Sequence, residues 1–305
     1  MSNVKPKIVV VIPTLNEVES VGRVLDEIFD TLTLNGWDFR VLVVDGRSID
    51  GTDKVAREKG AVVIYQRNSG YGDALKTGFI YAKEKLDADV LVMMDADFTY
   101  DAKDIPKLIQ PIVDGEADLV VGNRFKGMQK GSMGLINKVG NKILSWIARK
   151  TLKIDVHDTQ CGIRVFKAEL LNNMDLTCEG MPFATEMLAE AKLAGAKIIE
   201  KPVNYRPRIG KTKLNPVKDG LMITGTILRL LRDTSPLLFF GGIGFTFIII
   251  GVILGLDVTL EWLRTGTVGR IPTLLLTVLL IMGGFQFFAV GLLADMIKRF
   301  KRKIG

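Results

Sequence analysis

The chain has 305 residues, of which 48% are hydrophobic and 25% are charged, and its formal net charge is +7 at pH 7. Two long stretches, Leu237–Leu256 and Ile271–Ala294, contain no Asp, Glu, Lys or Arg, so every charged group lies elsewhere in the chain. This distribution excludes a disordered chain, a collagen-like fibre and a purely cytosolic enzyme, and it predicts a water-soluble body followed by a membrane region.

Before Phe125, short apolar stretches alternate with amphipathic helical patterns, which is typical of βαβ units and a largely parallel sheet. The predicted strands are Ile8–Ile12, Phe39–Val44, Ala61–Tyr65, Val90–Met94 and Asp118–Val121. The predicted helices between them are Glu17–Leu32, Asp50–Lys59, Tyr71–Lys85 and Asp104–Asp114. Ligands of open α/β sheets bind at the carboxyl ends of the strands, so the polar residues there should meet at one edge and bind a nucleotide.

The next part of the chain has a less regular pattern and is expected to complete the same domain. Its predicted elements are a basic amphipathic helix at Leu135–Leu152, a strand at Gly162–Phe166, a helix at Phe183–Ala194 and a strand at Lys197–Val203. Beyond them, Pro216–Asp233 places apolar residues among basic ones, which is typical of a helix lying on a membrane surface.

The two uncharged stretches are predicted to be transmembrane helices. At about 1.5 Å per residue, each is long enough to cross a hydrocarbon core. The segment after them is rich in Lys and Arg, whereas the connection Asp257–Arg270 has two acidic and two basic residues. By the positive-inside rule, the tail and the N-terminal body face the cytoplasm. We therefore predict a cell-membrane protein with two spans, whose basic residues near the bilayer contact membrane lipids rather than nucleic acid.

These patterns divide the chain into four parts. We expect residues 1–215 to form a cytosolic domain, residues 216–235 an interfacial helix, residues 236–297 the transmembrane region and residues 298–305 a basic cytosolic tail. Small residues would let the spans pack closely, either within one chain or in a homo-oligomer. They are Gly241, Gly242, Gly244, Gly283 and Gly284.

Asp95-Ala96-Asp97 is the sharpest local feature of the sequence. Two carboxylates one residue apart suit Mg²⁺, which completes its coordination with phosphate oxygens and water. An isolated pair of this kind is more often a solvated acidic turn. Its position after Val90–Met94, among the other polar strand ends, favours a site for a metal ion and a diphosphate.

Two other strand ends have a structural and a functional interpretation. Pro13–Glu17 starts a helix with Thr14 or Asn16 as N-cap, and its final carboxylate would reach the base and ribose of a nucleotide. The glycines of Asn68–Ala74 open a helix, but Leu75 occupies the last glycine position of a dinucleotide fingerprint. A tight turn near a phosphate is therefore expected there, without a dinucleotide.

Neither the only histidine nor the two cysteines predict a catalytic centre. His157 has no spacing typical of a zinc site or a hydrolase triad, so we interpret it as a polar loop residue. Cys161 and Cys178 lie outside any C-x-x-C motif and are expected to be reduced, as in a cytosolic domain.

Seven short motifs occur in an order that resembles one known family. They are Val11–Glu17, Val44–Thr52, Gly70–Ala74, Met94–Asp97, Val121–Phe125, Asp158–Arg164 and Pro202–Leu214. The chain resembles the family 2 glycosyltransferases with a GT-A fold, in particular the polyprenyl (dolichyl) phosphate sugar synthases. The resemblance implies an α/β nucleotide-sugar-binding domain with a mostly parallel central sheet, followed by an interfacial amphipathic helix and two transmembrane helices.

The resemblance also implies roles for individual residues. The nucleotide-sugar site would be lined by Pro13, Thr14, Glu17, Asp45, Asp95 and Ala96, and Asp95 and Asp97 would hold Mg²⁺ or Mn²⁺. Phosphate groups of donor and acceptor would meet Arg124, Arg208 and Lys213. The expected catalytic residues are Asp97, Arg124 and Asp158. Two positions depart from the family pattern: Gly46 follows Asp45 where paired acids are frequent, and Thr99 stands where dolichyl-mannose relatives often have Gln.

The implied reaction transfers one sugar to dolichyl (polyprenyl) phosphate at the cytosolic membrane face, with inversion. GDP-mannose, UDP-glucose and UDP-N-acetylglucosamine are the candidate donors. A lipid monophosphate with a second pKa near ~6 is already largely ionised at neutral pH, so the reaction does not need a strong general base. Two alternatives stay open: a membrane glycosyltransferase that extends a lipid-linked glycan or polysaccharide, and an inactive membrane-tethered scaffold.

Overall fold

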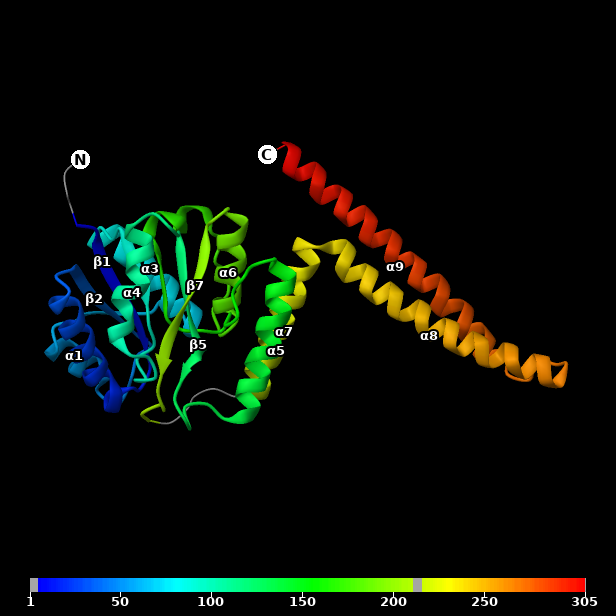
Figure 1. Ribbon diagram of the computed structural model, residues 1–305, viewed down its shortest axis with the longest axis horizontal. Coiled ribbons are helices and arrows are strands. Elements are labelled where there is room, and N and C mark those ends of the chain that lie inside the picture. Colours follow the sequence, from blue (N-terminus) through cyan, green and yellow to red (C-terminus); the bar gives the residue numbers. More distant parts are fainter. Residues whose placement is uncertain (1–4, 211–215, 305) are drawn as a thin grey trace. The chain divides into compact units, whose positions relative to one another are not determined.

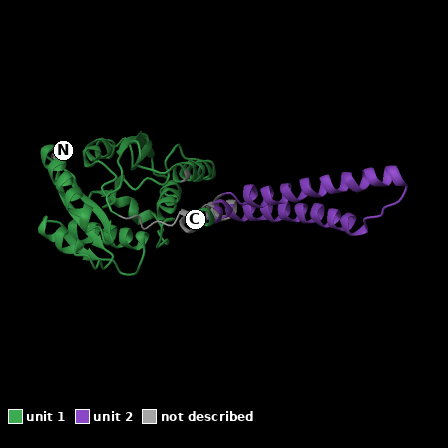
Figure 2. Ribbon diagram, turned by 90° about the horizontal axis from the view of Figure 1, so that it is seen from below, with its two compact units in different colours: residues 1–226 green, residues 227–305 purple. Residues whose placement is uncertain are grey.

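The computed structural model describes residues 5–210 and 216–304. The chain divides into two compact units, residues 1–226 and residues 227–305 (Figure 2). The first unit is an α/β domain and the second is a pair of long helices (Figure 1). The finer division at residues 215, 235 and 297 stays a prediction.

A mixed sheet forms the centre of the first unit. Its strands are β1 (Lys7–Thr14), β2 (Asp38–Asp45), β3 (Val62–Tyr65), β4 (Val90–Met93), β5 (Leu119–Met128), β6 (Arg164–Lys167) and β7 (Ile198–Tyr205). Their order is β3-β2-β1-β4-β6-β5-β7, and all neighbours are parallel except the two pairs that contain β6. The predicted, mostly parallel sheet is confirmed, with one reversed strand that the apolar pattern of the sequence did not indicate.

Helices cover both faces of this sheet. They are α1 (Val18–Leu34), α2 (Thr52–Glu58), α3 (Tyr71–Leu86), α4 (Ile105–Val113), α5 (Leu135–Leu152) and α6 (Phe183–Leu193), with short 3-10 helices η1 (Ala102–Asp104) and η2 (Ala168–Asn173). The strand order proceeds from β1 to β3 in one direction and then returns to β4, so right-handed crossovers place α3 on the opposite face from α1 and α2. Accordingly, α3 contacts α6, whereas α1 contacts α2 and α4.

The core lies where these helices meet the central strands. Residues 8–12 of β1 are almost completely buried, as expected of a strand covered on both faces. On α3, Gly78 allows the closest approach, because a Cβ there would lie 2.5 Å from Val11 Cγ1 and 2.7 Å from Val44 Cγ2. This packing fixes α3 over the two strands whose ends carry Thr14 and Asp45.

The reversed strand β6 brings another loop to the functional edge of the sheet. A parallel strand contributes the loop that follows it, whereas β6 contributes the loop that precedes it. Residues 158–163 therefore lie at the same edge as the segments that follow β1, β2 and β4, and Gly162 N–H donates to the Tyr100 hydroxyl, in the segment after β4, at 2.6 Å. This arrangement joins the Asp158–Arg164 motif to the Asp95–Asp97 turn.

Along the chain after β7, α7 (Pro216–Thr234) begins in the first unit and leads to α8 (Pro236–Thr265) and α9 (Ile271–Ile304). Among the described residues, Pro236–Thr265 and Ile271–Lys298 are long and apolar enough to cross a membrane. The predicted connection Asp257–Arg270 is mostly helical, because α8 continues to Thr265, where Gly266 caps it with a φ of 71°. Arg270 stabilises this longer helix by pairing with Asp257 at 3.0 Å and Glu261 at 2.5 Å.

Candidate active site

Three turns with unusual backbone geometry mark the carboxyl edge of the sheet. Asn16, Arg47 and Phe98 follow β1, β2 and β4 and have positive φ angles of 50°, 64° and 65°. Left-handed conformations in non-glycine residues cost on the order of 1–3 kcal/mol each and persist only where the surroundings hold them. Their clustering at one edge indicates that the fold maintains a specific geometry there.

Hydrogen bonds from the loop after β2 hold the start of α1. Asn16 N–H donates to Ser48 Oγ at 2.8 Å, and Glu17 N–H donates to Thr52 Oγ1 at 2.8 Å. The prediction of Thr14 or Asn16 as N-cap of α1 is wrong, because α1 begins after Glu17 and has no side-chain cap of its own. Left-handed Asn16 instead accepts from Ile49 N–H at 2.9 Å.

Asp45 is fully buried at the end of β2 and organises the same two loops. Its Oδ2 accepts from the Thr14 hydroxyl at 3.0 Å and from the Ser48 hydroxyl at 2.6 Å, and its Oδ1 accepts from Ser48 N–H at 2.7 Å. Beside it, a Cβ on Gly46 would lie 3.2 Å from Leu15 Cδ1 and from Thr14 O. The predicted donor-site residues Thr14 and Asp45 thus lie together. Of the other two predicted residues, Pro13 precedes Thr14 and is half-buried, and Ala96 lies between Asp95 and Asp97 and is buried.

Asp97 lies in a network that joins three segments of the chain. Its Oδ1 accepts from Thr99 N–H at 3.1 Å and from the Thr99 hydroxyl at 2.5 Å. Its Oδ2 accepts from Arg208 Nη1 at 3.0 Å, and Arg208 Nη2 donates to Glu17 Oε1 at 2.5 Å. The structure therefore brings together the predicted residues Glu17, Asp97 and Arg208, and it assigns Thr99 to the orientation of Asp97.

Asp95 is held on the other side of the same turn. Its Oδ1 accepts from the Tyr71 hydroxyl at 2.8 Å, and a Cβ on Gly162 would lie only 2.1 Å from its Oδ2. Burial, followed by the negative charge of Asp97, raises the pKa of Asp95 to about 6. An acidic pair of this kind has unfavourable charge repulsion that a bound cation would relieve.

Arg124 and Asp158 form a buried, bidentate ion pair. Arg124 Nε donates to Asp158 Oδ2 at 2.8 Å and Nη2 donates to Oδ1 at 2.7 Å, while the exposed fractions of the two side chains are 8% and 0%. Although burial lowers it, the Asp158 carboxylate keeps the pKa of Arg124 well above its ordinary value. The guanidinium also lies 5.4 Å from the ring centre of Tyr205. Arg124 is thereby fixed as a cation at this edge.

Two buried side chains that the sequence analysis did not select hold the Asp158 loop. Glu200 accepts from the N–H groups of His157 and Asp158 at 2.6 and 2.9 Å and from Asn123 Nδ2 at 2.7 Å. Arg164 donates to the carbonyls of Cys161, Ala184 and Thr159 at 3.1, 2.6 and 2.8 Å. Arg164 belongs to a motif noted above, but Glu200 has no local sequence signal because its partners lie on distant segments.

The remaining predictions have separate outcomes. Lys213 lies outside the described residues. The N–H groups of Gly72 and Asp73, at the start of α3, donate to the carbonyl of Glu179 at 2.7 and 3.2 Å, so in this structure the predicted phosphate turn is occupied by backbone. Cys161 is buried and Cys178 is partly buried, and neither forms a disulfide. Burial raises the pKa of Cys161 to about 12, which agrees with a packed residue rather than a nucleophile.

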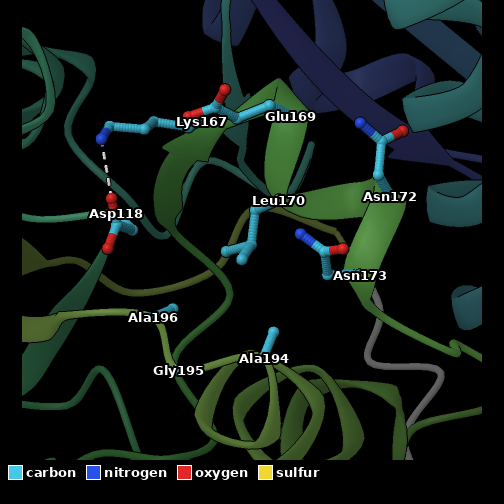
Figure 3. Close-up of a pocket in the computed structure, with 9 residues that line it drawn as sticks. All are labelled: Asp118, Lys167, Glu169, Leu170, Asn172, Asn173, Ala194, Gly195 and Ala196. Carbon is cyan, nitrogen blue, oxygen red and sulfur yellow. Dashed lines mark hydrogen bonds and ion pairs between the residues drawn. The ribbon is translucent and has the colours of Figure 1, made fainter. Parts of the chain in front are cut away.

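A cavity of about 270 Å³ lies at the opposite edge of the sheet, where β5 begins and β6 ends (Figure 3). Its lining includes the Asp118–Lys167 ion pair, with an O–N distance of 2.7 Å. No residue of the candidate active site lines it. It therefore has no part in the site described here.

The residues present fit a hard divalent cation. Asp95 and Asp97 supply carboxylate oxygens, and an arginine already neutralises one of them. Within residues 5–210 and 216–304, no group of three or more His, Cys, Asp or Glu side chains is placed to hold a metal ion. The donor set is therefore that of Mg²⁺ or Mn²⁺ bound by few protein carboxylates and completed by phosphate oxygens and water.

Comparison with solved structures defines the class of fold. The chain is similar to glucosyl-3-phosphoglycerate synthase from Mycobacterium tuberculosis, solved in complex with Mn²⁺, UDP and glucosyl-3-phosphoglycerate. The TM-score is 0.59 and the identity 22%, over 74% of this chain and 80% of that one. The expected GT-A fold is confirmed.

Sequence comparison then gives the family. Residues 9–174 match the family described as Glycosyl transferase family 2. The chain is 33% identical to glycosyltransferase AglJ of Haloferax volcanii, over 95% of this chain and 93% of AglJ. It is 36% identical to a dolichyl-phosphate hexose transferase of the same organism, over 73% of this chain and 93% of the relative. The chain belongs to glycosyl transferase family 2 and is a glycosyltransferase.

Proposed function

We propose that this glycosyltransferase moves one sugar from a nucleotide diphosphate sugar to a polyprenyl phosphate, with inversion at the sugar. The observation that carries the proposal is the carboxylate pair Asp95 and Asp97, placed beside Glu17 and Arg208 at the carboxyl edge of the sheet. The acceptor is inferred from the relative named as a dolichyl-phosphate hexose transferase. The two apolar helices would keep the catalytic domain near such a lipid.

On the donor side, Asp95 and Asp97 would hold Mg²⁺ or Mn²⁺. The metal ion would neutralise negative charge on the leaving diphosphate. Thr99 orients Asp97, and Tyr71 and the close backbone of Gly162 orient Asp95. The loops fixed by Asp45 would form the wall against which base and ribose bind.

On the acceptor side, the phosphate oxygen itself is the nucleophile. A phosphate monoester is largely ionised at neutral pH, so the protein has to position an anion rather than remove a proton. Arg124 is a permanent cation whose direction is fixed by Asp158. When the donor and the metal ion enter, Arg208 would break its bonds to Asp97 and Glu17 and bind a phosphate group instead. Lys213 is proposed as a further phosphate contact.

We also propose the orientation in the membrane. The catalytic domain and the basic C-terminal tail would face the cytoplasm, and the turn after Thr265 the opposite side. In this arrangement α7 would lie on the bilayer surface, with Leu221, Met222 and Leu228 exposed on its apolar side. The acceptor phosphate would then reach the domain from the cytoplasmic leaflet.

The proposal is tested by incubating the purified full chain in detergent with Mg²⁺ or Mn²⁺, polyprenyl phosphate and one radiolabelled donor at a time. GDP-mannose, UDP-glucose and UDP-N-acetylglucosamine are the first donors. Label should enter the organic phase from one donor, and only when lipid phosphate is present. Label that enters a lipid-linked glycan supplied in place of polyprenyl phosphate, and does not enter polyprenyl phosphate, would favour the glycan-extending alternative. No transfer from any donor by folded protein would favour the scaffold.

A matched pair of variants separates chemistry from folding. Asp97→Ala should lower transfer by at least about 100-fold, as when one electrostatic stabiliser is removed from an active site. Asp38→Ala is the control, because Asp38 is exposed at the start of β2, at the opposite edge of the sheet. Wild-type transfer by Asp97→Ala at saturating metal would refute the proposed role of the carboxylate pair.

A further inference from the structure

Several glycines of the second unit lie at the contact between α8 and α9. A Cβ on Gly244 would lie 2.5 Å from the carbonyl oxygen of Gly284, and a Cβ on Gly251 would lie 2.7 Å from Ile281 Cγ1. A Cβ on Gly291 would lie 3.2 Å from Phe240 Cβ. These contacts bring α8 and α9 of one chain together. A contact with another molecule has to use a different surface.

One side of α9 offers such a surface. Its residues recur at alternating intervals of four and three, which is the spacing of a coiled-coil seam. They are Leu275, Leu279, Met282, Gln286, Ala289, Leu293 and Met296, and all are exposed. We call this set the α9 seam. The exposed fractions of Leu279, Met282 and Leu293 are 67%, 57% and 60%, so α8 does not cover the seam.

Gln286 is the polar residue of this seam and lies near the middle of the candidate span Ile271–Lys298. Hydroxyls elsewhere in the two helices are satisfied locally: Thr246, Thr259 and Thr277 donate to carbonyls four residues earlier at 2.9, 2.7 and 2.9 Å. Within the part of the chain that the structure describes, the Gln286 carboxamide makes no hydrogen bond to any group. In hydrocarbon, an unbonded amide is expensive, so it needs a partner.

We propose that a second copy of this chain binds the α9 seam, with the Gln286 carboxamides of the two copies bonded to each other. A carboxamide carries both donors and acceptors, so it is complementary to itself across a two-fold axis. A second copy presents the same group at the same depth in the bilayer. An isoprenoid tail has no group that could bond the amide. The small side chain of Ala289, one turn away, lets the two helices approach.

The test measures association of the full-length chain in liposomes, by energy transfer between two differently labelled populations over a range of protein-to-lipid ratios. Gln286→Leu should weaken association by about 3- to 30-fold, the range of one interhelical polar contact. Gln286→Asn keeps a carboxamide and should retain most of it. Leu274→Ile, which lies about 100° around the helix from Leu275 and is exposed away from the seam, should leave association unchanged.

Equal association of wild type and Gln286→Leu would overturn the proposal. So would a wild-type chain that transfers no energy at any ratio, or one that associates only after another membrane protein is added. Folding of each variant is checked by its melting temperature in detergent. The outcome is independent of the proposed reaction, because Gln286 lies outside the catalytic domain.

Discussion

Arg208 donates from Nη1 to Asp97 Oδ2 at 3.0 Å, so a side chain that follows β7 neutralises a carboxylate that follows β4. The exposed fractions of the two side chains are 22% and 13%, which leaves the pair only partly screened by water. The same arginine bonds Glu17. Arg208 thus places a fixed positive charge on the carboxylate that we assign to the metal ion.

Arg208→Gln should therefore strengthen binding of Mn²⁺ without donor, by about tenfold, because a charge contact near a protein surface is worth on the order of 1 kcal/mol or more. Sugar transfer should fall at the same time, since the phosphate contact is lost. Titration followed by the electron paramagnetic resonance signal of free Mn²⁺ measures the first effect. Arg40→Gln is the control, because Arg40 is exposed near the start of β2, at the opposite edge of the sheet. Weaker Mn²⁺ binding by Arg208→Gln would contradict the proposal that Arg208 competes with the metal ion for Asp97.

Asp95→Asn should abolish transfer and raise the melting temperature of the metal-free protein. The pKa of Asp95 is about 6 in the fold, above its ordinary 3.8, so the stability contributed by its protonated form is present below about pH 4 and lost as the pH rises through 6. Asparagine does not ionise, so the protein no longer loses stability as the pH rises, and the asparagine side-chain oxygen can still accept a hydrogen bond from the Tyr71 hydroxyl. We expect a gain on the order of 1–2 kcal/mol at pH 7.5 and a much smaller one at pH 4.5, measured by thermal unfolding. A melting temperature of Asp95→Asn below that of the wild type at pH 7.5 would contradict this prediction.

Asp158→Ala should destabilise the domain by about 3–5 kcal/mol, because it leaves the buried guanidinium of Arg124 without its partner. The double variant Arg124→Met, Asp158→Leu should recover much of this loss, since two apolar side chains replace both charges. Neither protein should transfer sugar. Chemical unfolding of all variants, including Arg124→Met alone and Asp158→Leu alone, gives the coupling between the two positions. Full additivity of the single changes would disprove the coupling.

Gly162→Ala should reduce transfer more than it reduces stability. The added Cβ would lie 2.1 Å from Asp95 Oδ2, so that carboxylate has to move. Transfer should fall by about 10²-fold, as when a reacting group is displaced by about 1 Å, and the apparent affinity for Mn²⁺ should fall with it. Gly134→Ala is a suitable control, because a Cβ there meets nothing within 4 Å. Normal kinetics of Gly162→Ala would show that Asp95 does not need its present position.

The parts of the fold that follow from local patterns were predictable. The apolar strands and amphipathic helices before Phe125 appear where their periodicity places them, and the strand ends meet at one edge because the strands are parallel. The reversed strand β6 was not predictable, since a short buried strand has the same apolar pattern in either direction. Similarly, the connection between the spans was predicted to begin at Asp257, whereas α8 continues to Thr265 and Arg270 pairs with Asp257 and Glu261.

In the site, the sequence could indicate which residues carry charge but not how the charges pair. Arg124 was expected at a phosphate and Asp158 among the catalytic residues, and the structure bonds them to each other across 34 positions of the chain. Arg208 was expected at a phosphate, and it bonds Asp97, 111 positions away. Such pairs depend on the packing of distant segments, which no local pattern reports. Glu200 escaped notice for the same reason.

The reversed strand also limits where the chain can change in length. Arg164 begins β6 and pairs in register with Met93 on one side and Val121 on the other. A one-residue insertion that shifted β6 would turn the buried Arg164 to the opposite face of the sheet and free three carbonyls at once. Insertions between α5 and His157 leave that register untouched. Homologues that differ in length between α5 and β6 should therefore carry the difference before His157, next to the helix, and keep the spacing from Asp158 to Arg164 constant.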